Sequence, residues 1–245
     1  MLQLKKVIVI RQGLAKKKAS HPYCAAPRGA RDTHYAVRSY YQLIVRKSSY
    51  MLASNLLHGS RVRLTALTND DLPVIASWHD DAAFARLFDA RPAAPKTASA
   101  LENWLYEYSR ANNGFVFAIR PLGDEKLIGF IELEGILWAH QHAWISIAIG
   151  DVAQRGRGYG GEALRLALRF AFQELNLHRV QLTVFSYNEP AIVLYEKLGF
   201  VREGAYREYL QRDGKRYDMY LYGLLRDEWL SHPSSDEIIE SPRAQ

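Results

Sequence analysis

A run of glycines and arginines between a strand pattern and a helix pattern constrains the fold more than any other part of this chain. Apolar and polar side chains alternate over residues 144–149, and apolar side chains recur at helical spacing over residues 162–175. The connecting run, Gln154–Gly161, holds four glycines and two arginines. Glycine lets the backbone approach a ligand closely, and the free amides of a helix's first turn favour a bound phosphate. The sequence therefore predicts a strand, a phosphate-binding turn and a helix in succession.

Two common phosphate motifs fit this turn poorly. A P-loop needs Lys and then Ser or Thr after its last glycine, but Glu162 and Ala163 occupy those places. The run 156–161 matches G-x-G-x-x-G, the dinucleotide pattern, which also needs an acid at the end of the next strand for the ribose. That strand ends at residues 185–187 without an acid. A dinucleotide site is therefore disfavoured, and a different phosphate ligand is expected.

Charge is distributed unevenly along the chain. Residues 1–50 carry a net charge of +10, while the rest of the 245 residues carries −4. Nucleic-acid binding is therefore expected only through the basic N-terminal arm and not through the folded body. The single cysteine, Cys24, excludes an internal disulfide and has no metal-ligand spacing, so no metal is expected. The low cysteine content fits a reducing compartment, and we expect a cytoplasmic protein. No apolar run approaches the roughly 18 residues of a membrane helix, so we expect no membrane span.

Composition divides the chain into three segments. Residues 1–58 show no sustained period and predict a basic, disordered extension. Four explanations stay open for it. It could have no structured role, be a targeting peptide, or contact nucleic acid or a membrane, or the true start of the protein could be Met51. Residues 59–230 are predicted as the folded domain. Residues 231–245 are polar and acidic, and they predict a disordered tail.

Strands and helices alternate along the predicted domain. Strands are expected at about 62–64, 115–120, 127–134, 144–149, 179–185, 201–211 and 217–225. Helices are expected at 68–78, 99–110, 162–175 and 188–198, with Ser99 and Asn188 as N-caps. Asp213-Gly214 predicts the turn between the last two strands. Residues 89–96 read as a loop.

Two motifs and the element order together resemble one enzyme superfamily. Arg155-x-x-Gly158-x-Gly160 is similar to the R/Q-x-x-G-x-G/A pyrophosphate loop of the GNAT N-acetyltransferases. The block Asn188–Phe200 resembles the N-x-x-A-x-x-L-Y-x-x-x-G-F segment of the same superfamily. The likeness covers about 61–229. The run from Leu177–Val180 to Leu224–Trp229 is similar to the branch that includes ribosomal-protein N-terminal and spermidine acetyltransferases. It implies an α/β (α+β) fold with about seven strands in a mixed, mainly antiparallel sheet, splayed in the middle and covered by helices on both faces.

The resemblance also implies a cofactor and its site. GNAT enzymes move an acetyl group from acetyl-CoA to an amine, so acetyl-CoA is the expected co-substrate. The strand carrying Ile147 and Ile149 would splay from its neighbour, and its free backbone groups would bind the pantetheine. Asn188 would contact CoA, or it would only cap its helix. The pyrophosphate would lie on the turn residues Arg155, Gly156, Arg157, Gly158, Tyr159 and Gly160.

The expected catalytic residues are an acid matched to the family and a base that the motifs leave open. Tyr195 is the family-matched acid for the leaving thiolate, although its position on an apolar helix face also suits a packing residue. The base of some relatives falls on Thr183 here, so that assignment does not transfer. Glu132 and Glu134 share a strand face and are the best local candidates. A solvated strand face, the loop histidines at 140 and 142, or ordered water are the alternatives.

The sequence leaves the acceptor open among a small-molecule amine, a polyamine and a peptide N-terminus. The segments 78–96, 137–142 and 206–217 are expected to rim the acceptor cleft, with aromatic rings and mixed charge. A non-catalytic acyl-CoA-binding or interaction module on the same fold is the alternative function. Dimers are common among similar proteins, so a homodimer is possible and the oligomeric state stays open.

Overall fold

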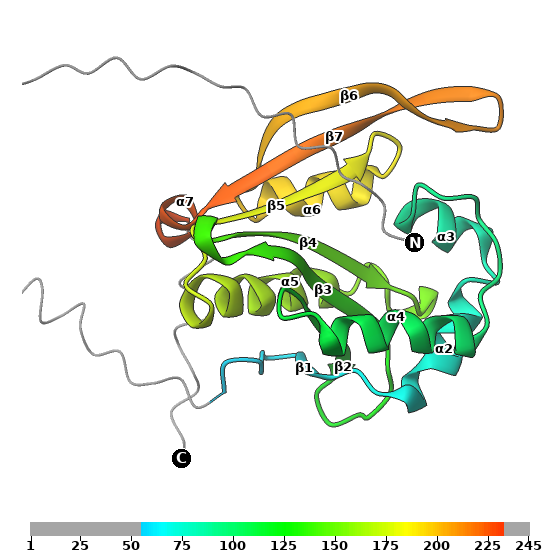
Figure 1. The fold of residues 1–245 in the computed structure, drawn as a ribbon, viewed down its shortest axis with the longest axis horizontal. Coiled ribbons are helices and arrows are strands. Elements are labelled where there is room, and N and C mark those ends of the chain that lie inside the picture. The colour runs from blue at the N-terminus through cyan, green and yellow to red at the C-terminus, as the bar shows by residue number, and fades with distance from the viewer. Residues whose placement is uncertain (1–54, 233–245) are drawn as a thin grey trace, which may run out of the picture. The chain divides into compact units, whose positions relative to one another are not determined.

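The structure, a computed structural model, describes residues 55–232. Expectations for the rest of the N-terminal extension and of the C-terminal tail lie outside the described residues. Seven strands form one sheet in the order β1-β2-β3-β4-β5-β7-β6 (Figure 1). The strands are β1 (Val62–Ala66), β2 (Phe115–Pro121), β3 (Gly129–Leu137), β4 (His142–Ile149), β5 (Arg179–Phe185), β6 (Val201–Arg212) and β7 (Lys215–Leu225). All neighbours pair antiparallel except β4 and β5, which confirms the predicted mixed, mainly antiparallel sheet.

Six α-helices lie in the described part of the chain. They are α2 (Leu72–Trp78), α3 (Ala82–Phe88), α4 (Ala98–Arg110), α5 (Tyr159–Arg169), α6 (Glu189–Lys197) and α7 (Arg226–Ser231). A π-helical turn, Phe170–Glu174, continues α5, which accounts for the longer apolar periodicity of the sequence. α3 was not expected, because it is only seven residues long and is capped by Asp81 alone. The predicted cap Ser99 is wrong, since the Thr97 side chain accepts from Ala100 N and caps α4.

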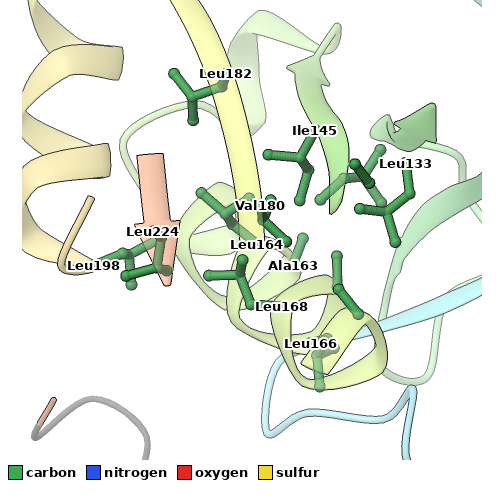
Figure 2. Packing of buried hydrophobic residues seen from close by; sticks show 14 of the residues in the cluster. Leu133, Ile145, Ala163, Leu164, Leu166, Leu168, Val180, Leu182, Leu198 and Leu224 are labelled. Carbon is green, nitrogen blue, oxygen red and sulfur yellow. The ribbon is translucent and has the colours of Figure 1, made fainter. Parts of the chain in front are cut away.

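Two apolar clusters cover opposite faces of the sheet. The larger cluster joins α5 and α6 to β3, β4, β5 and β7, and Figure 2 shows Leu164 and Leu168 of α5 beside Val180 of β5. The other cluster joins α2, α3 and α4 to the opposite face, where Phe130 of β3 is its largest fully buried member. Alternation along β3 produces this division, because Ile131 and Leu133 face α5 while Phe130 and Glu132 face α4.

The parallel ladder between β4 and β5 stops early. Pairing covers only His142 with Arg179, Ala143 with Val180, and Trp144 with Gln181. β4 runs on to Ile149 and β5 to Phe185 without further pairing to each other, although each keeps its partner on the other side. The sheet is therefore splayed at its centre, as predicted. We call the unpaired stretch, 145–149 facing 182–185, the central opening.

Among residues 55–232 there is no helix with the length and apolar character needed to cross a bilayer.

Candidate functional site

The glycine turn leads from the end of β4 into α5 with the backbone bent at two glycines. Gly156 has φ 72° and Gly158 has φ 83°, which is the left-handed region that glycine occupies without steric cost. Gly158 is the N-cap of α5, and within residues 55–232 no side chain caps the first turn. A Cβ at Gly156 would meet nothing within 4 Å. The amides that follow therefore have no side-chain partner from an N-cap.

The Arg155 side chain links the turn to the end of β4 by hydrogen bonds. Its Nε donates to the carbonyl of Ile149 at 2.9 Å, and its Nη2 reaches the carbonyl of Gly150 at 3.4 Å. The guanidinium therefore ties the turn to the end of β4 while its charge stays next to the glycines. Arg157 is exposed, and its carbonyl accepts from Arg61 Nη1 at 3.2 Å.

A second fixed point of α5 is Glu162, whose role the sequence did not suggest. Its buried carboxylate accepts from the Ser60 amide, from Ser60 Oγ at 2.9 Å and from the Arg61 amide at 3.1 Å. A carboxylate in the first turn also suits the helix dipole. Glu162 thus fixes the start of α5, and with it the glycine turn, to the segment that enters β1.

Replacing Glu162 with glutamine should lower the free energy of unfolding by about 2 kcal/mol. Hydrogen bonds to a buried charged group are worth about 1.5–3 kcal/mol. All three donors bond Glu162 Oε1, so glutamine keeps an acceptor oxygen but loses the charge that strengthens these bonds. Urea unfolding followed by circular dichroism measures the change. Glu174→Gln, at an exposed glutamate beyond the same helix, is the matched control and should change stability by less than about 0.5 kcal/mol. Equal effects of the two variants would contradict the anchoring role.

Small residues let three elements meet beside the central opening. A Cβ at Gly160 would lie 3.5 Å from Ile149 Cγ1 and 4.0 Å from both Ile147 Cδ1 and Leu194 Cδ2. A Cβ at Gly161 would lie 3.2 Å from Leu194 Cδ1. The start of α5, the free end of β4 and helix α6 therefore converge here. The structure brings the glycine turn together with Ile147 and Ile149, as the sequence predicted.

Tyr195 lies on α6 on the α5 side of the sheet. Its side chain is 7% exposed, and its ring packs edge-on against Phe200 with centroids 5.8 Å apart. Within residues 55–232 its hydroxyl makes no hydrogen bond. Burial raises the pKa of Tyr195 to about 12, so the phenol keeps its proton at neutral pH. In this resting state the group is a proton donor.

Asn188 precedes α6 but does not cap it with its side chain. Its carbonyl accepts from the amides of Ala191 and Ile192, both at 3.1 Å, and its side chain makes no capping hydrogen bond. The predicted side-chain cap is therefore wrong. The half-buried carboxamide is left available to a ligand.

Glu132 lies on the opposite face of the sheet, in a set of polar groups under α4. Its Oε2 accepts from Ser146 Oγ at 2.6 Å, and its Oε1 accepts from Trp104 Nε1 at 3.2 Å. The Tyr108 hydroxyl is buried nearby, and burial, with the charges of Glu132 and Glu134, raises its pKa. Burial is also the main cause that raises the pKa of Glu132, against the hydrogen bond from Ser146. A carboxyl with a raised pKa is better matched to proton transfer near neutrality than an ordinary one.

The other base candidates lie in different surroundings. Glu134 is exposed and pairs with Trp144, at the last position where β4 still meets β5. His140 and His142 stack with ring centroids 6.4 Å apart, at the opposite end of β4 from the glycine turn. Burial is the main cause that lowers the pKa of His142, which favours its neutral form. Within the described residues no group of acidic, histidine or cysteine side chains could hold a metal ion.

Two of the segments expected to rim the acceptor cleft are joined by hydrogen bonds. Arg212 Nη2 donates to the carbonyls of Asp89, Ala90 and Arg91 at 3.1, 3.0 and 3.0 Å. Arg86 of α3 forms a two-pronged ion pair with Asp213 at 2.8 and 3.0 Å. The tip of the β6–β7 hairpin is thereby held against α3 and the loop that follows it (Figure 1).

His79 at the end of α2 lies in the same region and is buried edge-on against Phe84, with centroids 5.3 Å apart. Burial lowers the pKa of His79 from 6.5 to about 4, with a further contribution from the charge of Lys96. The folded state therefore takes up this proton at a lower pH than the unfolded state does. Stability from this group is complete above about pH 6.5 and is lost as the pH falls from there to about 4.

His79→Leu should therefore flatten the acid side of the stability curve. We expect the loss of unfolding free energy between pH 7 and pH 4 to be about 2 kcal/mol smaller than in the unmodified protein. Urea denaturation at stepped pH measures it, and His140→Leu, at an exposed histidine, is the control. Parallel curves for His79→Leu and the unmodified protein would contradict the assignment.

Comparisons with known proteins agree with this geometry. Residues 61–201 match the family described as an acetyltransferase (GNAT) domain. An uncharacterized N-acetyltransferase of the SPbeta prophage of Bacillus subtilis is 30% identical over 175 residues, which is 71% of this chain and 96% of that protein. The spermidine N(1)-acetyltransferase of Vibrio cholerae is 28% identical over 172 residues, 70% of this chain and 97% of the relative.

A solved structure extends the likeness to three dimensions. The crystal structure of spermidine N-acetyltransferase from Vibrio cholerae, in complex with CoA and spermine, superposes with a TM-score of 0.65 at 27% identity. The match covers 71% of this chain and all of that one. The [ribosomal protein uS5]-alanine N-acetyltransferase of Escherichia coli is 27% identical over 50% of this chain and 63% of its own length.

Proposed function

The chain belongs to the GNAT acetyltransferase family, and we propose that it transfers the acetyl group of acetyl-CoA to a primary amine by direct attack in a ternary complex. The observation that carries this proposal is the central opening beside an uncapped helix start. Two strands that part over 145–149 and 182–185 leave backbone groups without ladder partners. Such groups need other partners, and the amides of a pantetheine arm supply them.

In this proposal the cofactor lies along three features in a row. The amides of Gly156–Gly160 hold the pyrophosphate, with Arg155 and Arg157 supplying positive charge and Tyr159 starting the helix. Backbone groups at Ile147 and the amide of Ile149 receive the pantetheine, while the Ile149 carbonyl already accepts from Arg155 Nε. The Asn188 carboxamide, which caps nothing, is free to contact CoA. The Vibrio cholerae structure named above contains CoA, which supports acetyl-CoA as the co-substrate here.

The proposed reaction places the acid and the base on opposite faces of the sheet. The amine approaches from the α4 side and attacks the thioester carbonyl in the central opening. The amide near Ile147 stabilises the oxygen of the tetrahedral intermediate. Tyr195, on the α6 side, donates its proton to the departing sulfur. Its raised pKa keeps the hydroxyl protonated at every ordinary pH, so the proton is present when the sulfur leaves.

Proton removal from the acceptor is the second requirement. An alkyl ammonium has a pKa near 10.4, so forming the neutral amine at pH 7 costs about 4–5 kcal/mol. Glu132 is the better of the two carboxylate candidates, because burial raises its pKa and because its partner Ser146 lies on the strand that borders the opening. Glu134 is exposed beside the paired end of the ladder, so we assign it at most a weak part.

We propose a primary amine as the acceptor and do not assign it to a narrower class. The relatives are named for spermidine and for the alanine of a ribosomal protein, which leaves both a polyamine and a peptide N-terminus open. Two carboxylates of the rim, Asp89 and Asp213, are engaged by Arg91 and Arg86. They are thus already neutralised, which favours neither class.

The remaining parts of the proposal concern the whole chain. We propose 59–230 as the catalytic domain, flanked by the basic segment 1–58 and the acidic segment 231–245. A cytoplasmic setting and a homodimer are consistent with this assignment.

A thiol-release assay with acetyl-CoA and a panel of monoamines, polyamines and short peptides tests the function, with mass spectrometry to identify the product. We expect amine-dependent thiol release and a product 42 Da heavier than its acceptor, the mass of an acetyl group less a proton. Tight CoA binding without turnover on any amine would favour a non-catalytic acyl-CoA-binding module instead.

A further inference from the structure

Ser146 lies between the buried carboxylate of Glu132 and the central opening. The two residues are cross-strand partners on β3 and β4, and Ser146 Oγ donates to Glu132 Oε2 at 2.6 Å. Ser146 belongs to the part of β4 that has left β5, because the last paired residue is Trp144. Its side chain faces α4, since its neighbours Ile145 and Ile147 contact the α5 cluster. A hydroxyl thus stands at the border of the opening, on the side opposite α5.

Glu132 itself is poorly placed to meet an acceptor directly. Only 7% of the residue is exposed, and its second oxygen is occupied by the indole of Trp104. Ser146, by contrast, is half-buried, and its backbone leads directly into the proposed oxyanion amide at Ile147. The serine hydroxyl is therefore on the less buried residue of this hydrogen-bonded pair.

On the opposite side of the opening, the described residues 182–185 of β5 include no carboxylate. Continuing the parallel register by two residues from the Trp144–Gln181 pair would bring Thr183 of β5 opposite Ser146. Thr183 is exposed and faces away from the α5 cluster, because Leu182 and Val184 belong to that cluster. The only described acid that is hydrogen-bonded to the border of the opening is therefore Glu132, through Ser146.

We propose that Ser146 is a catalytic residue that relays the acceptor's proton to Glu132, and this inference rests on the proposed acetyl transfer. The ammonium gives one proton to Ser146 Oγ while the hydroxyl proton of Ser146 passes to Glu132 Oε2. The neutral nitrogen then forms the C–N bond, and the C–S bond breaks as Tyr195 protonates the sulfur. The tyrosinate left at Tyr195 then accepts the surplus proton from the new amide nitrogen, and Glu132 releases its own proton to solvent. The sum is one amide, one free thiol and one proton.

Charged and hydrogen-bonding groups surround this pair and influence its titration. Glu134 lies on the same strand, Tyr108 and Trp104 lie on α4, and Lys96 precedes α4. The charge of Glu132 acts on Lys96, whose pKa is lowered chiefly by burial. The pH profile of the relay therefore belongs to the whole group, and the test compares variants with each other and does not rely on one absolute value.

The experiment measures kcat/KM for the best amine from pH 6 to pH 10 in the full chain and in Ser146→Ala, Ser146→Thr, Glu132→Gln and the Ser146→Ala/Glu132→Gln double variant. We expect Ser146→Ala to lose about tenfold at pH 7. Ser146→Thr, which keeps the hydroxyl, should stay within about threefold. The double variant should be no worse than Glu132→Gln alone, because the two groups act as one unit. The losses should shrink toward pH 10, where a much larger fraction of the amine is already neutral than at pH 7.

Controls separate this inference from the function that it rests on. Ser109→Ala removes a hydroxyl that bonds only its own helix, at Tyr106 O, and should leave the rate unchanged. The CoA dissociation constant, measured by calorimetry, should be the same in all variants. Suppose that the unmodified protein transfers acetyl. The relay is then wrong, while the function stands, if Ser146→Ala has the same kcat/KM as the unmodified protein. It is also wrong if the losses of Ser146→Ala and Glu132→Gln multiply in the double variant, or if the loss is equal at every pH. If the unmodified protein acetylates no amine, both fail together.

Discussion

Tyr195→Phe should lower kcat by about 100-fold or more while leaving the dissociation constant of CoA unchanged. The substitution removes one hydroxyl that makes no hydrogen bond within residues 55–232, so packing against Phe200 is retained. What is lost is the proton for the departing sulfur, and that loss acts on the transition state alone. Steady-state kinetics with saturating acetyl-CoA, together with calorimetric titration of CoA, measure both quantities.

Tyr222→Phe is the matched control for this prediction. Tyr222 is a buried tyrosine whose hydroxyl donates to Glu196 at 2.8 Å, and burial, with the charge of Glu196, raises its pKa to about 12 as well. It lies on β7 in the same apolar cluster but has no assigned part in the reaction. We expect this variant to lose stability without losing kcat. If kcat is equal in Tyr195→Phe and the unmodified protein, Tyr195 is not the acid and only packs in the core.

Gly156→Asp should weaken CoA binding by about 30- to 100-fold relative to Gly156→Asn. The two variants share shape and backbone strain, because Asp and Asn both tolerate positive φ better than other side chains do. A Cβ at this position meets nothing within 4 Å, so both should fold. They differ only in a negative charge, which repels a diphosphate bound a few ångströms away by about 2–3 kcal/mol.

Calorimetric titration with CoA at low and high salt measures this difference. The gap between the two variants should narrow in salt, because screening reduces repulsion at an exposed turn. Equal affinities of Gly156→Asp and Gly156→Asn would place the diphosphate away from the glycine turn. A large loss in both would instead indicate backbone strain.

Local signals predicted the parts of the site that lie close together in sequence. The positive φ angles at Gly156 and Gly158 follow from glycine within a strand-turn-helix pattern. The helix that follows was also predicted, because the π-helical turn after α5 keeps its apolar residues on nearly the same face. The central opening was expected only from the resemblance, because nothing in the residues of β4 or β5 says where a parallel ladder stops.

Contacts between distant segments could not be read in this way. Glu162 meets Ser60 across about a hundred residues, and a charged residue in the first turn of a helix looks solvent-exposed from sequence alone. Ser146 was missed because only the register between β3 and β4 makes Glu132 its partner. An alternating pattern does not fix that register, since a shift by two residues keeps the same side chains on each face. Asn188 shows the opposite error, since a common N-cap residue stands at the N-cap without using its side chain.

A crystal structure of this chain with CoA tests the central claim most directly. We expect the diphosphate against the amides of residues 156–160 and the pantetheine in the central opening, hydrogen-bonded to backbone groups of β4 beyond Trp144. CoA bound elsewhere, or a β4–β5 ladder that closes so that no pantetheine enters it, would contradict the account.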